Sequence, residues 1–178
     1  SNLLAVLSVF DKTGQLEKAI SLVPYLTSID GRMESLENKL GLQVVVDFAH
    51  TPDALQNALQ AIKEQAQGDV YCVFGCGGDR DISKRPLMAA IAERYARHVI
   101  VTNDNPRTEN PENIIADIAQ GFARSSHRVV MDREQAIYLA VEEARPGDAI
   151  LIAGKGHESY QIIGQEKLHF SDQLVAQN

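Results

Sequence analysis

The chain has 178 residues, of which 44% are hydrophobic and 23% charged, and its formal net charge is -7. This length suits one α/β domain with a small appendage, and no apolar run approaches the roughly 20 residues of a membrane span. The acidic balance argues against a general nucleic-acid binder, which normally has a basic face. With Cys72 and Cys76 as its two cysteines, the sequence predicts a reduced cytoplasmic protein, with neither a disulfide framework nor a zinc site. Its start also lacks the features of a signal peptide.

Two short helices are predicted at the start, over residues 2–10 and 15–26. The first is apolar nearly all round, so it should be buried, yet a pair of short helices offers it little cover. The chain also begins at Ser1 without a methionine. We therefore expect a processed chain or a fragment whose first helix lacks its proper neighbour.

After Gly31 the pattern alternates between strands and helices. Apolar runs predict strands at 32–36, 42–48, 70–74, 98–102, 128–131 and 149–153, then a hairpin of 160–163 with 167–170. Helices are predicted at about 51–68, 85–97 and 132–144, and from residues 110 and 171 onward. N-cap residues precede three of them: Thr51, Asn110 and Asp132. This alternation implies right-handed crossovers in a mainly parallel sheet, the α/β class.

Three of the predicted strands end in loops rich in glycine, proline and charge. Strand 70–74 opens into residues 75–81, strand 98–102 into 103–107, and strand 149–153 into 154–158. Ligands of open α/β sheets bind beyond the carboxyl ends of the strands. We therefore expect these loops to form the functional site together.

The first loop, Gly75-Cys-Gly-Gly-Asp-Arg80, is similar to a phosphate-binding loop. It lacks the third glycine of the dinucleotide fingerprint, and no Walker A motif occurs anywhere in the chain. This chain alone is thus not expected to be a phosphotransferase or a dinucleotide enzyme. The glycines would let the backbone approach a ligand, with Arg80, Lys84 and Arg85 as cationic donors suited to a carboxylate. The alternative is a tight turn with exposed charges.

The second loop, Asp104-Asn-Pro-Arg107, offers a carboxylate, an amide and a guanidinium within four residues. Such a set can bind a zwitterion, with Asp104 on an ammonium group, Arg107 on a carboxylate and Asn105 on either. The alternative is an Asx-turn stiffened by Pro106, with Arg107 in solvent. Glu158, in the third loop, adds a second carboxylate and favours a dipolar ligand.

A further group, Asp47-Phe-Ala-His50, directly precedes a predicted helix start. Main-chain N–H groups at a helix start can bind a phosphate, and His50 can donate to the same anion. The alternative is a structural histidine.

Five motifs in this order resemble the C-terminal domain of the Mur ligases, in particular the member that adds meso-diaminopimelate. They are Gly31-Arg-Met-Glu34, Asp47-Phe-Ala-His-Thr-Pro-Asp53, Gly75-Cys-Gly-Gly-Asp-Arg-Asp81 with Lys84-Arg-Pro86, Asp104-Asn-Pro-Arg107 and Gly154-Lys-Gly-His-Glu158. The resemblance covers residues 30–178 and implies a Rossmann-like sheet with a C-terminal β-hairpin. Residues 1–29 resemble the helical end of the family's central ATPase domain.

The resemblance implies a cytoplasmic amide ligase of peptidoglycan synthesis that uses ATP and Mg²⁺. In that family ATP phosphorylates the D-glutamyl carboxylate of UDP-N-acetylmuramoyl-L-alanyl-D-glutamate, and the diaminopimelate amine attacks the acyl phosphate. The P-loop, most metal ligands and the UDP-sugar site lie in two upstream domains. This chain is therefore expected to bind diaminopimelate and close over ATP, with no metal site, no catalytic residue and no turnover alone. Its expected partners are these substrates and domains, not nucleic acid or membrane.

Carried over by position, the resemblance implies two sets of binding residues. The diaminopimelate contacts are Arg80, Asp104, Asn105, Pro106, Arg107, Gly154 and Glu158. The ATP-facing contacts are Arg32, Asp47, His50 and Asn2. Phe48 stands where the family often has tyrosine, so no hydrogen bond is expected there.

Arg107 is expected to select diaminopimelate over lysine, which lacks the distal carboxylate. Leaving a fully buried guanidinium unpaired costs roughly 3–5 kcal/mol, on the order of 10²- to 10³-fold or more in discrimination. The alternatives are a lysine-adding ligase or folylpolyglutamate synthase, both disfavoured by Asp104-Asn-Pro-Arg107. A stand-alone amino-acid-binding module is a third, and it would fold without an exposed apolar helix.

Overall fold

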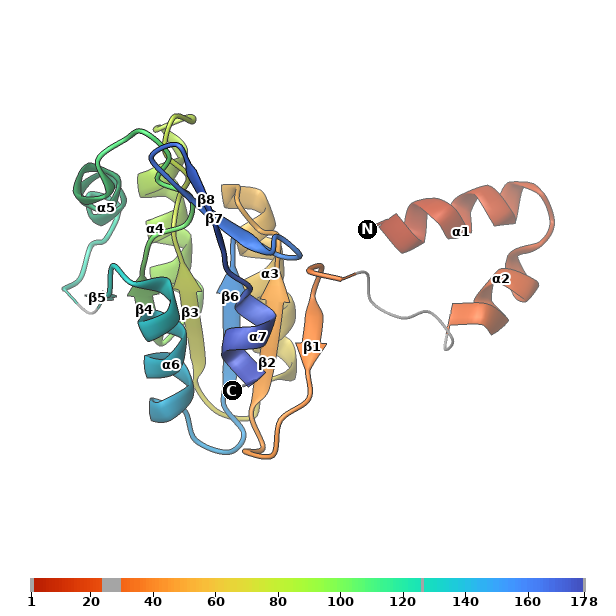
Figure 1. Ribbon diagram of the computed structural model, residues 1–178. Helices are drawn as coiled ribbons and strands as arrows, with labels where there is room; N and C mark the ends of the chain where they lie inside the picture. Colours follow the sequence, from red (N-terminus) through yellow and green to blue (C-terminus); the bar gives the residue numbers. More distant parts are fainter. Residues whose placement is uncertain (1, 24–29, 126, 178) are drawn as a thin grey trace.

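The structure, a computed structural model, describes residues 2–23, 30–125 and 127–177. Its centre is a six-stranded sheet in the order β1-β2-β6-β3-β4-β5 (Figure 1). Five neighbouring strands are parallel: β2 (Gln43–Asp47), β6 (Ala149–Ala153), β3 (Val70–Phe74), β4 (His98–Val101) and β5 (His127–Val129). The edge strand β1 (Glu34–Leu36) runs antiparallel to β2. The predicted α/β class is confirmed.

Helices cover both faces of the sheet, and each face has its own core. On one face lie α3 (Pro52–Gln65), α4 (Lys84–Tyr95) and α5 (Pro111–Ala119). On the other lie α6 (Arg133–Glu143) and α7 (Asp172–Gln177). Because the central strands β3 and β6 are covered on both sides, all of their residues are buried. This explains why these strands are continuous apolar runs in the sequence.

The predicted helix caps are confirmed. The Thr51 hydroxyl accepts a hydrogen bond from the Ala54 N–H, the Asn110 side chain accepts one from Glu112, and the Asp132 carboxylate accepts one from Gln135. These bonds satisfy main-chain donors that have no partner inside the helix. They also fix where each helix begins, directly after a strand-end loop.

Several predicted bounds differ from the structure. The first strand begins at Glu34 rather than at residue 32, because Met33 adopts a φ of 46°, which interrupts extended backbone. The strand predicted at 128–131 lies at His127–Val129. The second predicted helix is α2 (Leu16–Leu22), and its expected last residues 24–26 lie outside the described residues.

The helix pair at the start remains poorly covered. α1 (Asn2–Lys12) contacts α2, and within the described chain neither helix contributes to the two cores. Their exposed apolar side chains are Val6, Val9, Phe10, Ile20 and Leu22. From Val6 onward the first helix is mostly exposed, as expected, and the predicted boundary at residue 30 lies next to residues outside the described chain.

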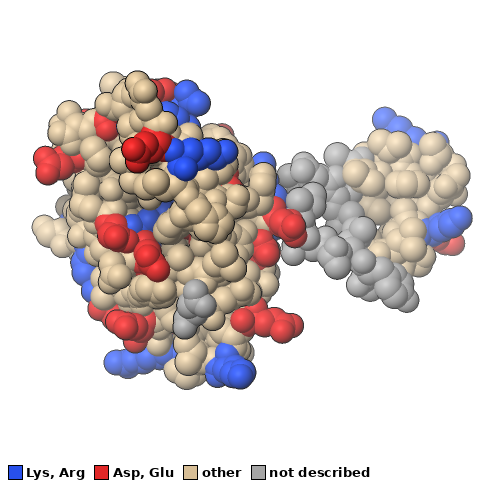
Figure 2. All heavy atoms as spheres, viewed as in Figure 1, with Lys and Arg blue, Asp and Glu red and all other residues tan. Residues whose placement is uncertain are grey.

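The predicted C-terminal hairpin is present as β7 (Tyr160–Ile163) and β8 (Glu166–His169). It packs on the loop after β4, where the Arg107 N–H donates to the Ile162 carbonyl oxygen at 3.1 Å and the Gly164 N–H donates to the Arg107 carbonyl oxygen at 2.7 Å. Acidic and basic side chains are interspersed on the face drawn in Figure 2. Among the described residues, no helix has both the length and the apolar character that crossing a bilayer requires.

Candidate functional site

The strand-end loops meet in one cavity of ≈ 460 Å³. Six residues expected from the sequence line it: Arg80, Asp104, Asn105, Arg107, Gly154 and Glu158. His50 and Lys84 line it as well. The predicted convergence of the three loops is therefore confirmed, because the parallel strands β3, β4 and β6 all end at the same edge of the sheet.

The glycines of the loop after β3 allow it to lie against the loop after β4. A Cβ on Gly75 would lie 2.1 Å from the Thr102 carbonyl oxygen, and one on Gly78 would lie 1.9 Å from the Pro106 carbonyl oxygen. Both contacts are far shorter than van der Waals distance. The glycines at 75 and 78 are thus explained by contact between two loops, not by the approach of a ligand that the sequence suggested.

The three cationic residues of the first loop have different surroundings. Arg80 is exposed and lines the cavity. Lys84 lines it too, and its Nζ donates to the His50 carbonyl oxygen at 2.8 Å. Arg85 is fully buried, and its Nη1 lies 2.6 Å from Glu109 Oε1 and 2.8 Å from Asp117 Oδ2. Its hydrogen bond with Glu109 raises the pKa of Arg85. The prediction that Arg85 is a ligand donor is wrong, because this side chain ties α4 to α5.

Arg107 is held by its backbone and by one edge of its guanidinium. Its φ of 53° turns the loop sharply. Nη1 donates to the carbonyl oxygens of Gly78 at 2.9 Å and Asn105 at 3.3 Å. The side chain is half-buried in the cavity wall. Within the described chain Nη2 has no hydrogen-bond partner, which leaves one edge of the guanidinium available to a ligand.

Lys155, which the sequence analysis missed, is buried beside the two acids of the cavity. Its Nζ donates to Asn105 Oδ1 and to the Tyr160 carbonyl oxygen, both at 2.8 Å. It also lies 3.7 Å from Asp104 Oδ1 and 3.8 Å from Glu158 Oε2. Burial lowers the pKa of Lys155, and the charge of Asp104 opposes this. The available signal was a lysine two residues after a buried strand with an acid three residues later, since buried lysines are almost always paired.

The remaining predicted contacts differ in how much of each side chain is available. The Asn105 amide is engaged at both ends within the protein: Oδ1 accepts from Lys155 and from the Ile162 N–H, and Nδ2 donates to Glu158 Oε2 at 2.9 Å. Gly154 has a φ of 121°, and a Cβ there would lie 2.6 Å from Asp104 Oδ2. Pro106 is buried behind the cavity, against Gly78.

Three of the four residues predicted to face ATP, Arg32, Asp47 and His50, lie at the end of β2, and His50 also lines the cavity. The Arg32 guanidinium stacks 4.8 Å above the Phe48 ring, and His50 Nδ1 lies 2.8 Å from the Phe48 carbonyl oxygen. Asp47 is buried, and its Oδ2 accepts from the Met33 N–H at 2.7 Å; burial raises the pKa of Asp47. Asn2 is the first residue of α1. Of these residues, Arg32 and His50 are exposed.

A second buried ion pair supports the site from behind. Arg133 Nε lies 2.7 Å from Asp172 Oδ1, both side chains are fully buried, and Arg133 Nη2 also donates to the Ala153 carbonyl oxygen at 3.0 Å. The pair joins α6 and α7 to the end of β6. The last helix is capped by Ser171, whose hydroxyl accepts from the Leu174 N–H, while the Asp172 carboxylate binds Arg133.

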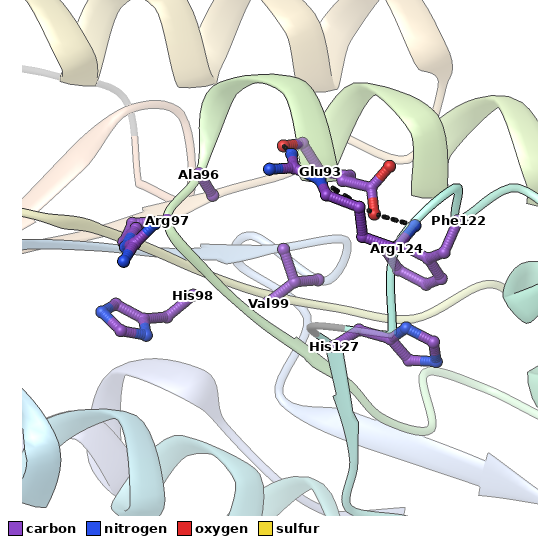
Figure 3. A pocket seen from close by; sticks show the side chains of 8 residues that line it. All are labelled: Glu93, Ala96, Arg97, His98, Val99, Phe122, Arg124 and His127. Carbon is purple, nitrogen blue, oxygen red and sulfur yellow. Dashed lines mark hydrogen bonds and ion pairs between the residues drawn. The ribbon is translucent and has the colours of Figure 1, made fainter.

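Another cavity, of ≈ 280 Å³, lies at the amino ends of β4 and β5 (Figure 3). There the Glu93 carboxylate accepts from the N–H groups of Ala123 and Arg124, and the rings of Phe122 and His127 stack. None of the residues that line this cavity was predicted to bind a ligand. The cavity at the carboxyl ends of the strands is therefore the candidate site.

Comparison with known proteins shows what the chain as a whole is similar to. The sequence model of the "Mur ligase, glutamate ligase domain" matches residues 31–156. The chain is 54% identical over 178 residues to the UDP-N-acetylmuramoyl-L-alanyl-D-glutamate--2,6-diaminopimelate ligase of Haemophilus ducreyi, covering 98% of this chain and 36% of that protein. It is 48% identical over 162 residues to the ligase of the same name from Bacillus cereus, covering 91% and 33%.

Solved structures show the same fold. A structure of UDP-N-acetylmuramoyl-L-alanyl-D-glutamate--2,6-diaminopimelate ligase superposes with a TM-score of 0.79 at 43% identity, over 98% of this chain and 36% of that chain. A folylpolyglutamate synthase/dihydrofolate synthase with Mn, AMPPNP and L-glutamate bound shares the fold, with a TM-score of 0.58 at 21% identity, over 80% and 36%. The chain spans about a third of the length of the curated relatives it matches. The family's sequence model matches most of the chain, and relatives share about half of its residues. The chain therefore belongs to the Mur ligase family.

Proposed function

We propose that this chain forms the amino-acid site of an amide ligase that adds meso-diaminopimelate to UDP-N-acetylmuramoyl-L-alanyl-D-glutamate. The observation that carries the proposal is the meeting of Arg80, Arg107, Asp104 and Glu158 in one cavity of ≈ 460 Å³. Small-molecule sites usually measure about 300–1,000 Å³. Meso-diaminopimelate has two ammonium and two carboxylate groups, so the two guanidinium groups can pair with its carboxylates and the two acids with an ammonium group.

The chain's own contribution is to hold and orient this amino acid. The available edge of Arg107 suits the distal carboxylate, because a guanidinium binds a carboxylate through two parallel hydrogen bonds. Asp104 and Glu158 suit an ammonium group. Holding the amino acid in this way would place its second amine for attack on an activated carboxyl group, which lowers the entropic cost of the reaction.

ATP would supply the phosphoryl group that activates the D-glutamyl carboxylate. Arg32, His50 and Lys84 fit contacts to its phosphates, because Arg32 and His50 are exposed and Lys84 lines the cavity next to them. Asp47 would act indirectly, since its carboxylate holds the main chain of Met33 next to Arg32. The described residues contain no group of three or more His, Cys, Asp or Glu arranged to hold a metal ion. We propose, from the resemblance to the family, that Mg²⁺ is held mainly by the upstream domains.

The proposal extends to the rest of the enzyme. The upstream ATPase and UDP-sugar-binding domains would be the partners of this chain, residues 1–29 would be the end of the ATPase domain, and the reaction would take place in the cytoplasm. The names of the relatives at about 50% identity support this assignment. This chain alone is then expected to release no ADP or phosphate.

A chimaeric enzyme tests the proposal. In it, this chain replaces the matching 36% of the Haemophilus ducreyi relative, and ADP release is measured with meso-diaminopimelate, lysine or glutamate. We expect turnover with diaminopimelate and a kcat/KM at least about tenfold lower with lysine. Equal use of lysine would identify a lysine-adding ligase, preference for glutamate would favour a folylpolyglutamate synthase, and ADP release by this chain alone would contradict the assigned division of labour.

A further inference from the structure

We propose that Lys155 is a positioning residue of the amino-acid site. In this role its ammonium group orients Asn105 and Glu158. It also neutralises one of the two negative charges of Asp104 and Glu158, so that these two acids together can bind one further ammonium group. The inference deepens the proposed function, on which its kinetic test depends. It concerns a residue that contacts the binding side chains and does not itself line the cavity.

Lys155 has two hydrogen bonds and two further acidic neighbours. Its Nζ donates to Asn105 Oδ1 and the Tyr160 carbonyl oxygen, both at 2.8 Å. The ammonium group also lies at ion-pair distance from Asp104 Oδ1, at 3.7 Å, and from Glu158 Oε2, at 3.8 Å. The Lys155 side chain has no solvent-accessible surface. A buried cation without paired acceptors would be strongly destabilising, so these contacts explain why a lysine is tolerated here.

Lys155 also determines which way the Asn105 amide points. Two donors, Lys155 Nζ and the Ile162 N–H at 2.9 Å, converge on one atom of that amide, which must therefore be the oxygen. The amide nitrogen then faces Glu158 Oε2 at 2.9 Å. Lys155 thus acts on Glu158 both through space and through Asn105. Without the ammonium group, the Asn105 amide would lose one of the two donors that fix its orientation.

The charges around Lys155 define what the site can accept. Asp104 and Glu158 carry two negative charges, and Lys155 neutralises one of them. Arg133 and Asp172, the buried charges that pack on this group from α6 and α7, neutralise each other at 2.7 Å. The acid pair is therefore left with one net negative charge, which matches one ammonium group of an amino acid. Arg80 and Arg107 remain on the cavity wall for carboxylates.

The orientation of Asn105 can be tested on this chain without any ligand. Hydrogen exchange of the Asn105 side-chain amide protons is followed by nitrogen-15 NMR in the unmodified chain and in Lys155→Met. We expect exchange at least about tenfold faster in the variant, because the amide is no longer fixed against Glu158. The matched control is Lys63→Met, an exposed lysine in the last turn of α3, which should leave the rate unchanged. Equal rates in the unmodified chain and Lys155→Met would overturn the proposal.

The effect on binding is tested in the chimaeric enzyme. Lys155→Met should raise the KM for diaminopimelate about tenfold or more while the KM for ATP stays within about twofold. In the double variant with Glu158→Gln, the increase in the KM for diaminopimelate, expressed as a free energy, should be smaller than the sum of the two single increases, because both substitutions disturb one network. If Lys155→Met lowers the amount of folded enzyme but leaves the KM for diaminopimelate unchanged, Lys155 only fills space. Additive effects of Lys155→Met and Glu158→Gln on this KM would lead to the same conclusion.

Two arrangements keep these tests decisive. Lys155→Gln lacks the positive charge but keeps an N–H donor, so it replaces the methionine variant if that variant does not fold. The KM for diaminopimelate should then still rise, and the exchange of the Asn105 amide should accelerate less than in the methionine variant; a KM and an exchange rate that both stay unchanged would overturn the proposal. If the unmodified chimaera does not use diaminopimelate, the proposed function is wrong. In that case the exchange rates of Asn105 still decide whether Lys155 orients this amide.

Discussion

Individual charged residues near the cavity differ in burial, and this changes what each can contribute. Arg85 is fully buried between Glu109 and Asp117, whereas Arg80, five positions earlier, is exposed at the cavity. Arg107 is half-buried, with Nη1 committed to carbonyl oxygens. The discrimination of 10²- to 10³-fold expected of Arg107 assumed full burial. A half-buried guanidinium remains partly hydrated when it loses its partner, so its contribution is smaller.

Replacing Arg107 with alanine tests its role. A hydrogen bond to a charged group contributes about 1.5–3 kcal/mol, so we expect Arg107→Ala to raise the KM of the chimaeric enzyme for diaminopimelate roughly 10- to 150-fold. The preference over lysine should largely disappear, because lysine does not use this contact. Arg97→Ala, an exposed arginine at the opposite edge of the sheet, should change neither quantity. An unchanged preference for diaminopimelate would remove Arg107 from the selectivity determinants.

At the scale of elements, two buried arginines join the helices around the site, one paired with partly exposed acids and the other with a fully buried acid. Arg85 ties α4 to α5, and Arg133 with Asp172 ties α6 and α7 to the end of β6. Each pair lies directly behind a loop that lines the cavity. Breaking a buried pair leaves an uncompensated buried charge, whereas an exposed pair can be replaced by water. The two kinds of pair should therefore differ strongly in their effect on stability.

We expect Asp172→Asn to lower the free energy of unfolding by roughly 3–5 kcal/mol. The matched control is Glu143→Gln, which breaks the exposed pair with Arg128 and should cost about 0–1 kcal/mol. Urea unfolding of this chain followed by circular dichroism measures both values. Similar losses in the two variants would show that burial does not make the Arg133–Asp172 pair important.

At the scale of the whole molecule, helices cover the apolar faces of the sheet, whereas α1 and α2 expose apolar side chains to solvent. A cavity of ≈ 330 Å³ between α1 and α2 is lined mainly by apolar side chains, among them Phe10, Ala19 and Leu22. Val6, Val9 and Ile20 are at least half exposed. Exposed apolar patches of this kind usually mark interaction sites.

We therefore expect this chain to self-associate when it is isolated. Light scattering should give a mean mass that rises with concentration above that of a monomer. Leu22→Glu should lower this mass towards the monomer, because it places a charge within the apolar surface. Leu174→Glu, an equally exposed leucine on α7, serves as the control and should have no effect. A monomer at every concentration would contradict this expectation.

The sequence by itself determined the elements and the edge of the sheet where the site lies. Apolar runs, N-cap residues and turn residues act over a few neighbouring positions, so β3, β6 and the starts of α3, α5 and α6 could be predicted from local pattern. The order of strands and helices then placed the carboxyl ends of β3, β4 and β6 together. Arg80, Asp104, Arg107 and Glu158 could be assigned to one cavity for that reason.

Only the tertiary structure decided how charges at this edge are paired. Lys155 and Asn105 are 50 positions apart, and Arg133 and Asp172 are 39 apart. A charged side chain can be buried only where a distant partner is brought to it. Local pattern cannot show this, so Arg85 was expected to bind a ligand and Lys155 was overlooked. The fold converts one lysine into an internal partner of two acids and leaves Arg80 and Arg107 at the cavity.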